Sequence, residues 1–177
     1  MKTFLRMTSL AATVAALALT AAPAQAASLV SATPQAKAKV KILKALTLTK
    51  SADLDFGTVV LGSGTWAGEV VSVDTGGTRI CGAGTNLTCS VAATAAAYNV
   101  TGSNNAVVTV TVPASVVISN GSVNLTVTTS KSIGATVTMP NSGNTGIDFS
   151  IGGSITLAST TADGLYQGDI VVQADYQ

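Results

Sequence analysis

Two aspartates on one face of a strand are the residues in this sequence best placed to do chemistry. The stretch 53–57 alternates, so Asp53 and Asp55 share one face and Leu54 and Phe56 the other. Paired carboxylates can serve as acid and base in hydrolysis. The other interpretation is a solvated face or a turn in which aspartates accept backbone hydrogen bonds. The sequence contains no histidine, which excludes Ser-His-Asp and Cys-His nucleophilic sites. We therefore expect no catalytic residues and no enzyme activity.

Cys81 and Cys89 are the only cysteines, and we expect them to form a disulfide closing a short loop. A metal site built on the two cysteines would need more ligands than a chain without histidine offers, so we expect no metal ion and no cofactor. Trp66 is the single tryptophan. Its two interpretations are packing in a core or loop and contact with a ligand.

The first 26 residues have the pattern of a secretory signal peptide. Lys2 and Arg6 precede an apolar run over about 10–22, and Ala-Gln-Ala at 24–26 supplies the small residues of a cleavage site. The mature protein is expected to start near residue 27 and to reach the periplasm, then the cell surface. An oxidising compartment agrees with the expected disulfide.

The charges of the mature chain are nearly balanced, with seven basic residues against eight acidic ones. This balance argues against nucleic-acid binding. No apolar run of 18 or more residues follows the signal peptide, so we expect no membrane insertion after its cleavage. Most of the basic residues nevertheless gather at the mature N-terminus: Lys37, Lys39, Lys41, Lys44 and Lys50.

The composition predicts an all-β protein, because the mature region is rich in Val, Thr, Ser, Ala and Gly. Short alternating runs separated by turn residues favour an Ig-like antiparallel β-sandwich. The predicted strands are 46–49, 68–74, 92–101, 106–112, 116–119, 123–129, 135–139, 147–157 and 166–176. Asn120-Gly121 predicts a hairpin. We expect a flexible arm over 27–35 and one domain over 36–177.

The two ends of the mature chain carry the clearest alternation. Residues 36–42, which we call the donor segment, alternate the apolar residues Ala36, Ala38, Val40 and Ile42 with three outward lysines. In the last strand, even-numbered residues from Tyr166 to Tyr176 point one way. A terminal strand with an intact apolar face raises the question of what pairs beside it.

Short motifs carry a family resemblance. The ADLDFG box (52–57), followed by SGTW (63–66), resembles a family of small secreted bacterial domains of unknown function. It also resembles the spore-coat-U-type subunits of archaic chaperone–usher pili. Pilins of this kind often end in an alternating strand with a penultimate tyrosine and a glycine fourteenth from the end, and Tyr176 and Gly164 hold these positions. The two cysteines lie later in the chain than the disulfide such pilins often carry.

The resemblance implies an Ig-like fold that lacks one strand and exposes an apolar groove. A strand of a periplasmic chaperone would fill the groove first. In the fibre, which an outer-membrane usher would assemble, the N-terminal arm of the next subunit would replace the chaperone strand. It implies a donor strand made of Ala36, Ala38, Val40 and Ile42, and an acceptor edge made of Gly164, Tyr166, Ile170, Val172 and Tyr176. The other interpretation of residues 36–42 is that they form the domain's own first strand.

The sequence therefore predicts a structural subunit of a pilus-like or fimbrial fibre that serves adhesion or biofilm formation and binds identical or related subunits. The alternative is a self-sufficient secreted β-sandwich that binds carbohydrate or matrix through its loops and Trp66.

Overall fold

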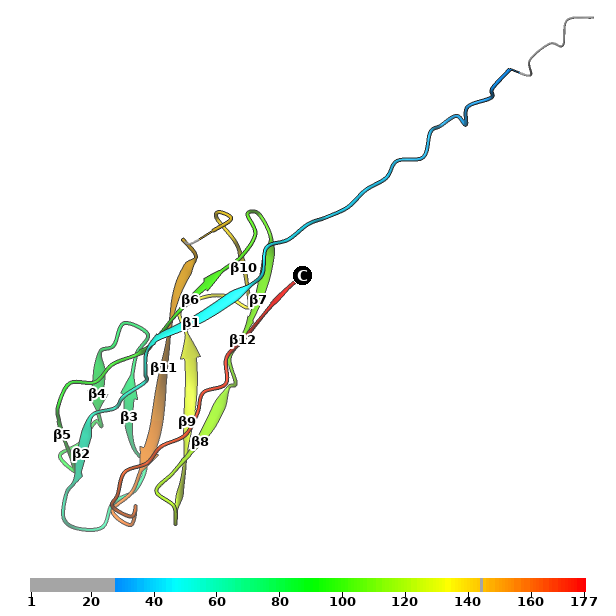
Figure 1. Cartoon of the computed structure of the whole chain (residues 1–177). Coiled ribbons are helices and arrows are strands. Elements are labelled where there is room, and N and C mark those ends of the chain that lie inside the picture. The colour runs from blue at the N-terminus through cyan, green and yellow to red at the C-terminus, as the bar shows by residue number, and fades with distance from the viewer. Residues whose placement is uncertain (1–27, 144) are drawn as a thin grey trace, which may run out of the picture. The chain divides into compact units, whose positions relative to one another are not determined.

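The computed structural model describes residues 28–143 and 145–177, and these form strands and no helix (Figure 1). The predicted signal peptide, residues 1–26, lies outside them. Nothing in the described part of the chain is a helix long and apolar enough to span a membrane. The twelve strands are β1 (Thr47–Ala52), β2 (Thr58–Leu61), β3 (Glu69–Val73), β4 (Arg79–Cys81), β5 (Leu87–Ser90), β6 (Ala96–Thr101), β7 (Val107–Thr111), β8 (Ser115–Ser119), β9 (Asn124–Lys131), β10 (Thr136–Thr138), β11 (Ile147–Leu157) and β12 (Gln173–Tyr176).

The chain divides into two units, Met1–Val40 and Lys41–Gln177. In the first unit, residues 28–40 have no regular secondary structure and their side chains are exposed. The second unit holds all twelve described strands. It is an Ig-like antiparallel β-sandwich, so the predicted fold class is confirmed.

The eleven-residue strand β11 organises the larger sheet. Its first half pairs with β6 and its second half with β3, so these two strands follow one another along it. β9 pairs with the middle of β11, and β8 forms a hairpin with β9 through the turn at Asn120-Gly121. That hairpin was predicted. β1 extends the sheet beyond β6, and β4 extends it beyond β3.

The chain passes from one sheet to the other between β7 and β8. β7 pairs with β10 and β12, whereas β8, which follows Pro113, pairs with β9. The C-terminal residues run antiparallel to both strands, pairing first at Ser119↔Gln167 and then from Gln173↔Thr111 onwards. In Figure 1 this segment, coloured red, runs beside β8 and on to β7. Residues 166–176 therefore follow one path, although only the last four residues of that path form a regular strand.

The interior contains two apolar clusters. The first lies between the β6–β11 and β7 layers and contains fully buried side chains such as Val100, Val108 and Ile151. The second contains Val71 and Leu157, and it is surrounded by apolar side chains that stay partly exposed. One end of the sandwich is therefore closed, and the other is open.

The interpretation of residues 36–42 as the domain's own first strand is wrong. These residues form no strand and their side chains are exposed; the first described strand is β1. Strand pairing begins where Leu46 and Leu48 bring larger side chains against the core. The short strands β2, β4 and β5 were not predicted, because their sequences alternate for only three or four residues.

Candidate functional site

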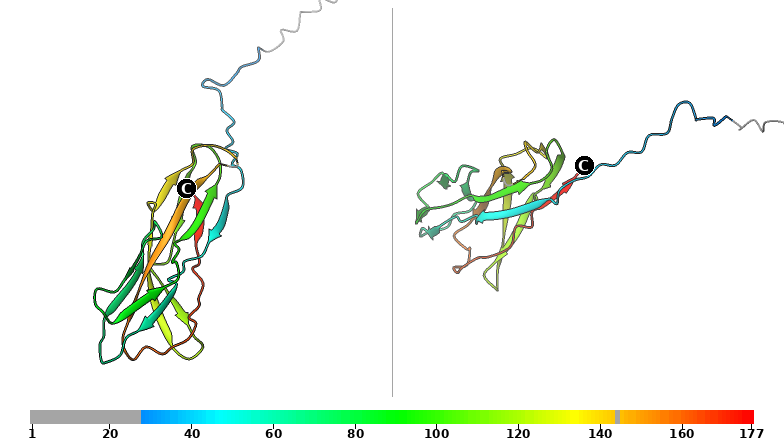
Figure 2. Two further views of the ribbon diagram at one scale, coloured as in Figure 1. Left: turned by 90° about the vertical axis from the view of Figure 1, so that its left-hand side faces the viewer. Right: turned by 45° about the horizontal axis from the view of Figure 1, so that its top comes forward.

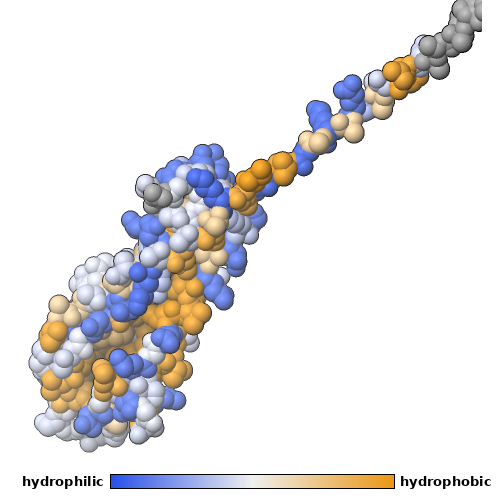
Figure 3. Space-filling model, in the orientation of Figure 1, coloured by the Kyte–Doolittle hydropathy of each residue, from blue (hydrophilic) through white to orange (hydrophobic). Residues whose placement is uncertain are grey.

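The open end of the sandwich contains an apolar groove of about 1070 Å³. Its floor comes from β8, β9 and β11, one wall from residues 53–61 and the other from residues 161–170. Figure 3 shows apolar side chains gathered in a hollow on this face, with polar side chains around them. The apolar residues of the floor are Val116, Ile118, Leu125, Val127, Ile155 and Leu157.

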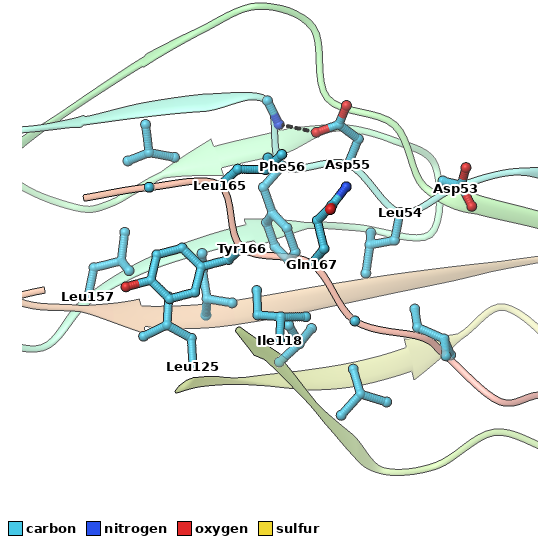
Figure 4. A pocket seen from close by; sticks show the side chains of 18 of the residues that line it. Asp53, Leu54, Asp55, Phe56, Ile118, Leu125, Leu157, Leu165, Tyr166 and Gln167 are labelled. Carbon is cyan, nitrogen blue, oxygen red and sulfur yellow. Dashed lines mark hydrogen bonds between the residues drawn. The ribbon is translucent and has the colours of Figure 1, made fainter. Parts of the chain in front are cut away.

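The ADLDFG box forms the first wall by making a turn. The backbone N–H of Gly57 donates to Asp55 Oδ1 (2.7 Å), and Gly57 has the positive φ of +71° that favours glycine. Arg79 Nη1 donates to the carbonyl oxygen of Phe56 (2.8 Å) and holds the turn against β4. The turn aims Leu54 and Phe56 into the groove, as Figure 4 shows.

Gly153 on β11 makes room for these two side chains. A Cβ at this position would lie 2.9 Å from Leu54 Cδ2 and 3.4 Å from Phe56 Cζ. The box therefore packs directly on the central strand, and its apolar residues continue the groove floor.

The two aspartates of the box have separate structural tasks. Asp55 accepts the hydrogen bond that closes the turn, so the interpretation as a turn aspartate is confirmed for this residue. Asp53 forms an ion pair with Lys50, and its hydrogen bond and charge raise the pKa of Lys50 above the ordinary value. Burial raises the pKa of Tyr98, whose ring lines the groove nearby.

Metal ligands do not gather in the groove. Across residues 28–143 and 145–177, no three His, Cys, Asp or Glu side chains lie together as a metal site would require.

The second wall is an extended segment whose backbone is mostly unpaired. Gly164 starts it in a turn with φ +134° against Asn120, and Tyr166 donates its hydroxyl to the carbonyl of Ala162 (2.9 Å). In the described structure, only one of residues 164–170 forms backbone–backbone hydrogen bonds. This residue is Gln167, which pairs with Ser119. Across the groove, β2 pairs with β5 alone among the described strands. The second wall therefore offers free backbone hydrogen-bonding groups, whereas the backbone of residues 53–57 in the first wall is largely hydrogen-bonded, for example between Asp55 and Thr94.

The predicted acceptor residues fall into two groups. Gly164, Tyr166 and Ile170 line the groove, whereas Val172 and Tyr176 pack beyond it on the closed core cluster. From residue 170 the even-numbered side chains are half-buried and the odd-numbered ones exposed, as the alternation predicted. Their role as an acceptor edge stays a prediction.

Tyr176 ties the C-terminus to the start of the sandwich, a role that the alternation did not suggest. Its hydroxyl donates to the carbonyl of Lys44 (2.9 Å) and accepts from the backbone N–H of Ser103 (2.7 Å). Figure 2 shows the start of β1, in cyan, and the end of β12, in red, converging here. A penultimate tyrosine thus joins three parts of the domain.

We expect Tyr176→Phe to lower the free energy of unfolding by about 1–3 kcal/mol, because the N–H of Ser103 and the carbonyl of Lys44 lose their partner. Urea denaturation of the purified mature chain measures this loss. Tyr166→Phe is the matched control, since its exposed hydroxyl bonds only to Ala162 within the described residues. Equal losses in the two variants would contradict a special role for Tyr176.

The remaining candidate residues are structural. Cys81 and Cys89 form the predicted disulfide, which joins β4 to β5 beside the open core cluster. A loop this short implies a stabilisation of about 2–3 kcal/mol. Trp66 packs on the same cluster and donates its indole N–H to the carbonyl of Gly62 (3.2 Å), so the packing interpretation is confirmed.

Residues 46–176 match the family described as "Domain of unknown function (DUF4402)". The chain belongs to this family. No curated protein and no solved structure matches the chain. The DUF4402 match begins one residue before β1 and ends with β12, so it includes both walls of the groove. The donor segment lies outside it.

Proposed function

We propose that this DUF4402 protein is a structural subunit of a cell-surface fibre, assembled when the donor segment of one copy adds a strand in the groove of the next. The observation that carries the proposal is the groove itself. Its floor is apolar, and its wall over residues 164–170 has backbone groups almost free of partners. Strand addition uses both features, because main-chain hydrogen bonds give affinity and alternate side chains enter the floor.

The donor segment matches the groove in length and in pattern. Seven extended residues span about 23 Å, and residues 164–170 are the part of the second wall whose backbone is almost unpaired. Val40 and Ile42 are 83% and 82% exposed in the isolated chain. Burying two such side chains contributes roughly 1.5–3 kcal/mol each.

The finer resemblance to spore-coat-U-type pilus subunits completes this proposal. A secreted subunit would lose residues 1–26, be held by a periplasmic chaperone with its groove covered, and reach the surface through an outer-membrane usher. The Cys81–Cys89 disulfide agrees with an oxidising compartment. The fibre would serve adhesion or biofilm formation. A binding domain that uses Trp66 is the weaker alternative, because the indole N–H already has a partner within the chain.

A matched pair of valine substitutions tests the proposal. We expect the purified mature chain to form ladders that resist SDS and disappear on boiling. Val40→Asp should reduce the laddered fraction more than about a hundredfold, because it places an unpaired charge on the apolar floor. Val30→Asp should leave the ladders unchanged, since Val30 is also exposed, at 93%, but lies outside the donor segment.

Gel electrophoresis of boiled and unboiled samples gives the measurement, and size-exclusion chromatography gives the oligomeric state. A mature chain that stays monomeric at all concentrations would exclude the fibre proposal. Equal effects of the two substitutions would exclude residues 36–42 as the donor.

A further inference from the structure

We infer that the lysine face of the donor segment is matched to an acidic rim around the groove, so that electrostatic attraction between subunits steers fibre assembly. This inference rests on the proposed strand donation and adds to it the force that brings the two surfaces together.

Opposite charges are separated along the chain. Residues 27–44 carry four lysines and no carboxylate. Residues 45–177 carry eight carboxylates and only three basic residues, Lys50, Arg79 and Lys131. The near-neutral total therefore hides a basic arm and an acidic domain. Such a chain attracts a second copy of itself in a head-to-tail manner.

Four of the eight carboxylates stand at the groove: Asp53, Asp55, Asp163 and Asp169. Lys50 is the one cation among the residues that line it, and it is already paired with Asp53. In the described structure, the carboxylates of Asp163 and Asp169 have neither a hydrogen bond nor an ion pair. The groove lining thus has four carboxylates against one cation, although Lys50 also lies within electrostatic range of Asp169.

In a donor segment bound in the groove, the lysines would lie close to this rim. When its apolar residues face the floor, Lys37, Lys39 and Lys41 face outward, at intervals of about 7 Å. Their long stems allow the ammonium groups to reach either wall while staying in water. Solvent-exposed pairs of this kind add little to final affinity. Their main effect is on the rate of association and on the choice of partner, because like-charged segments are repelled.

The salt dependence of assembly tests the inference. Raising the ionic strength from about 0.01 M to about 1 M shortens the screening length from roughly 30 Å to roughly 3 Å. We expect the initial rate of ladder formation by the mature chain to fall about tenfold or more over this range. The double variant Asp163→Asn/Asp169→Asn should assemble slowly at low salt, at a rate near that of the unaltered chain at high salt.

The matched control removes the same charge elsewhere. Asp148→Asn/Asp175→Asn changes two exposed carboxylates that do not line the groove, and this variant should keep the full salt dependence. A charge swap supplies a second measurement: a chain with Lys37, Lys39 and Lys41 all changed to Glu should assemble slowly, and adding Asp163→Lys/Asp169→Lys should restore its rate.

The outcomes separate this inference from the proposed function. Assembly whose rate is independent of salt, or a control that behaves like the rim variant, would overturn the steering by the rim and leave strand donation standing. A chain that forms no ladder at any salt concentration would refute strand donation and this inference with it.

Discussion

Mixing two variants that each fail to assemble is expected to give dimers and nothing longer. Val40→Asp destroys the donor segment but leaves the groove intact. Leu165→Arg blocks the groove with a long charged side chain but leaves the donor segment intact. In the mixture, each Leu165→Arg chain can donate to one Val40→Asp chain, and neither product can extend. Size-exclusion chromatography with light scattering measures the product.

Leu165 suits this purpose because it is 75% exposed yet lines the groove, where Figure 4 labels it. Its replacement does not disturb the buried core. Val171→Arg is the matched control, since Val171 is 64% exposed on the same segment but is absent from the groove lining. This control should assemble normally. Long ladders from the mixture, or monomers alone, would be incompatible with one donor and one groove per subunit.

Gly152→Ala is expected to lower the free energy of unfolding by at least about 3 kcal/mol, at the upper end of what overpacking a core costs. Gly152 lies in the centre of β11, where β6 ends and β3 begins. An added Cβ would lie 2.4 Å from the carbonyl oxygen of Val73 and 2.8 Å from the carbonyl carbon of Asp74. Both are backbone atoms, so relief requires moving β3 away from the central strand.

Urea denaturation measures the free energy of unfolding, and Gly134→Ala is the control. A Cβ at Gly134 meets its nearest atom at 3.5 Å, an ordinary contact. That substitution should be neutral, or stabilise by up to about 1 kcal/mol through the lower entropy of the unfolded chain. A small loss in Gly152→Ala, close to that of the control, would show that β3 can shift without cost.

Local patterns in the sequence were enough to predict much of the fold. Period-2 alternation located the paired stretches around Val108, Val127 and Phe149 and the half-buried face of the C-terminal segment. Asn120-Gly121 predicted its hairpin, and two cysteines in an even count predicted the disulfide. Each of these signals lies within about ten residues of chain, which is the range over which side-chain periodicity and turn chemistry act.

The candidate site was less accessible, because it depends on contacts between distant residues. Leu54 and Phe56 were expected to share a face, but only the fold sets them on Gly153, about a hundred residues later in the chain. The sequence singled out Tyr176 as the penultimate residue. It gave no sign of the hydrogen bond from the Tyr176 hydroxyl to the carbonyl of Lys44, because the two residues are 132 positions apart. The sequence also offered two uses for residues 36–42, and the tertiary structure excluded one of them.

The all-β class, most of the strands, the disulfide and the basic arm thus follow from the amino-acid pattern alone. The closed and open ends of the sandwich, and the four carboxylates around the opening, emerge only when the strands are packed together. Alternation shows which side chains of a strand turn inward. It does not show which strand lies opposite, or whether any strand lies there at all.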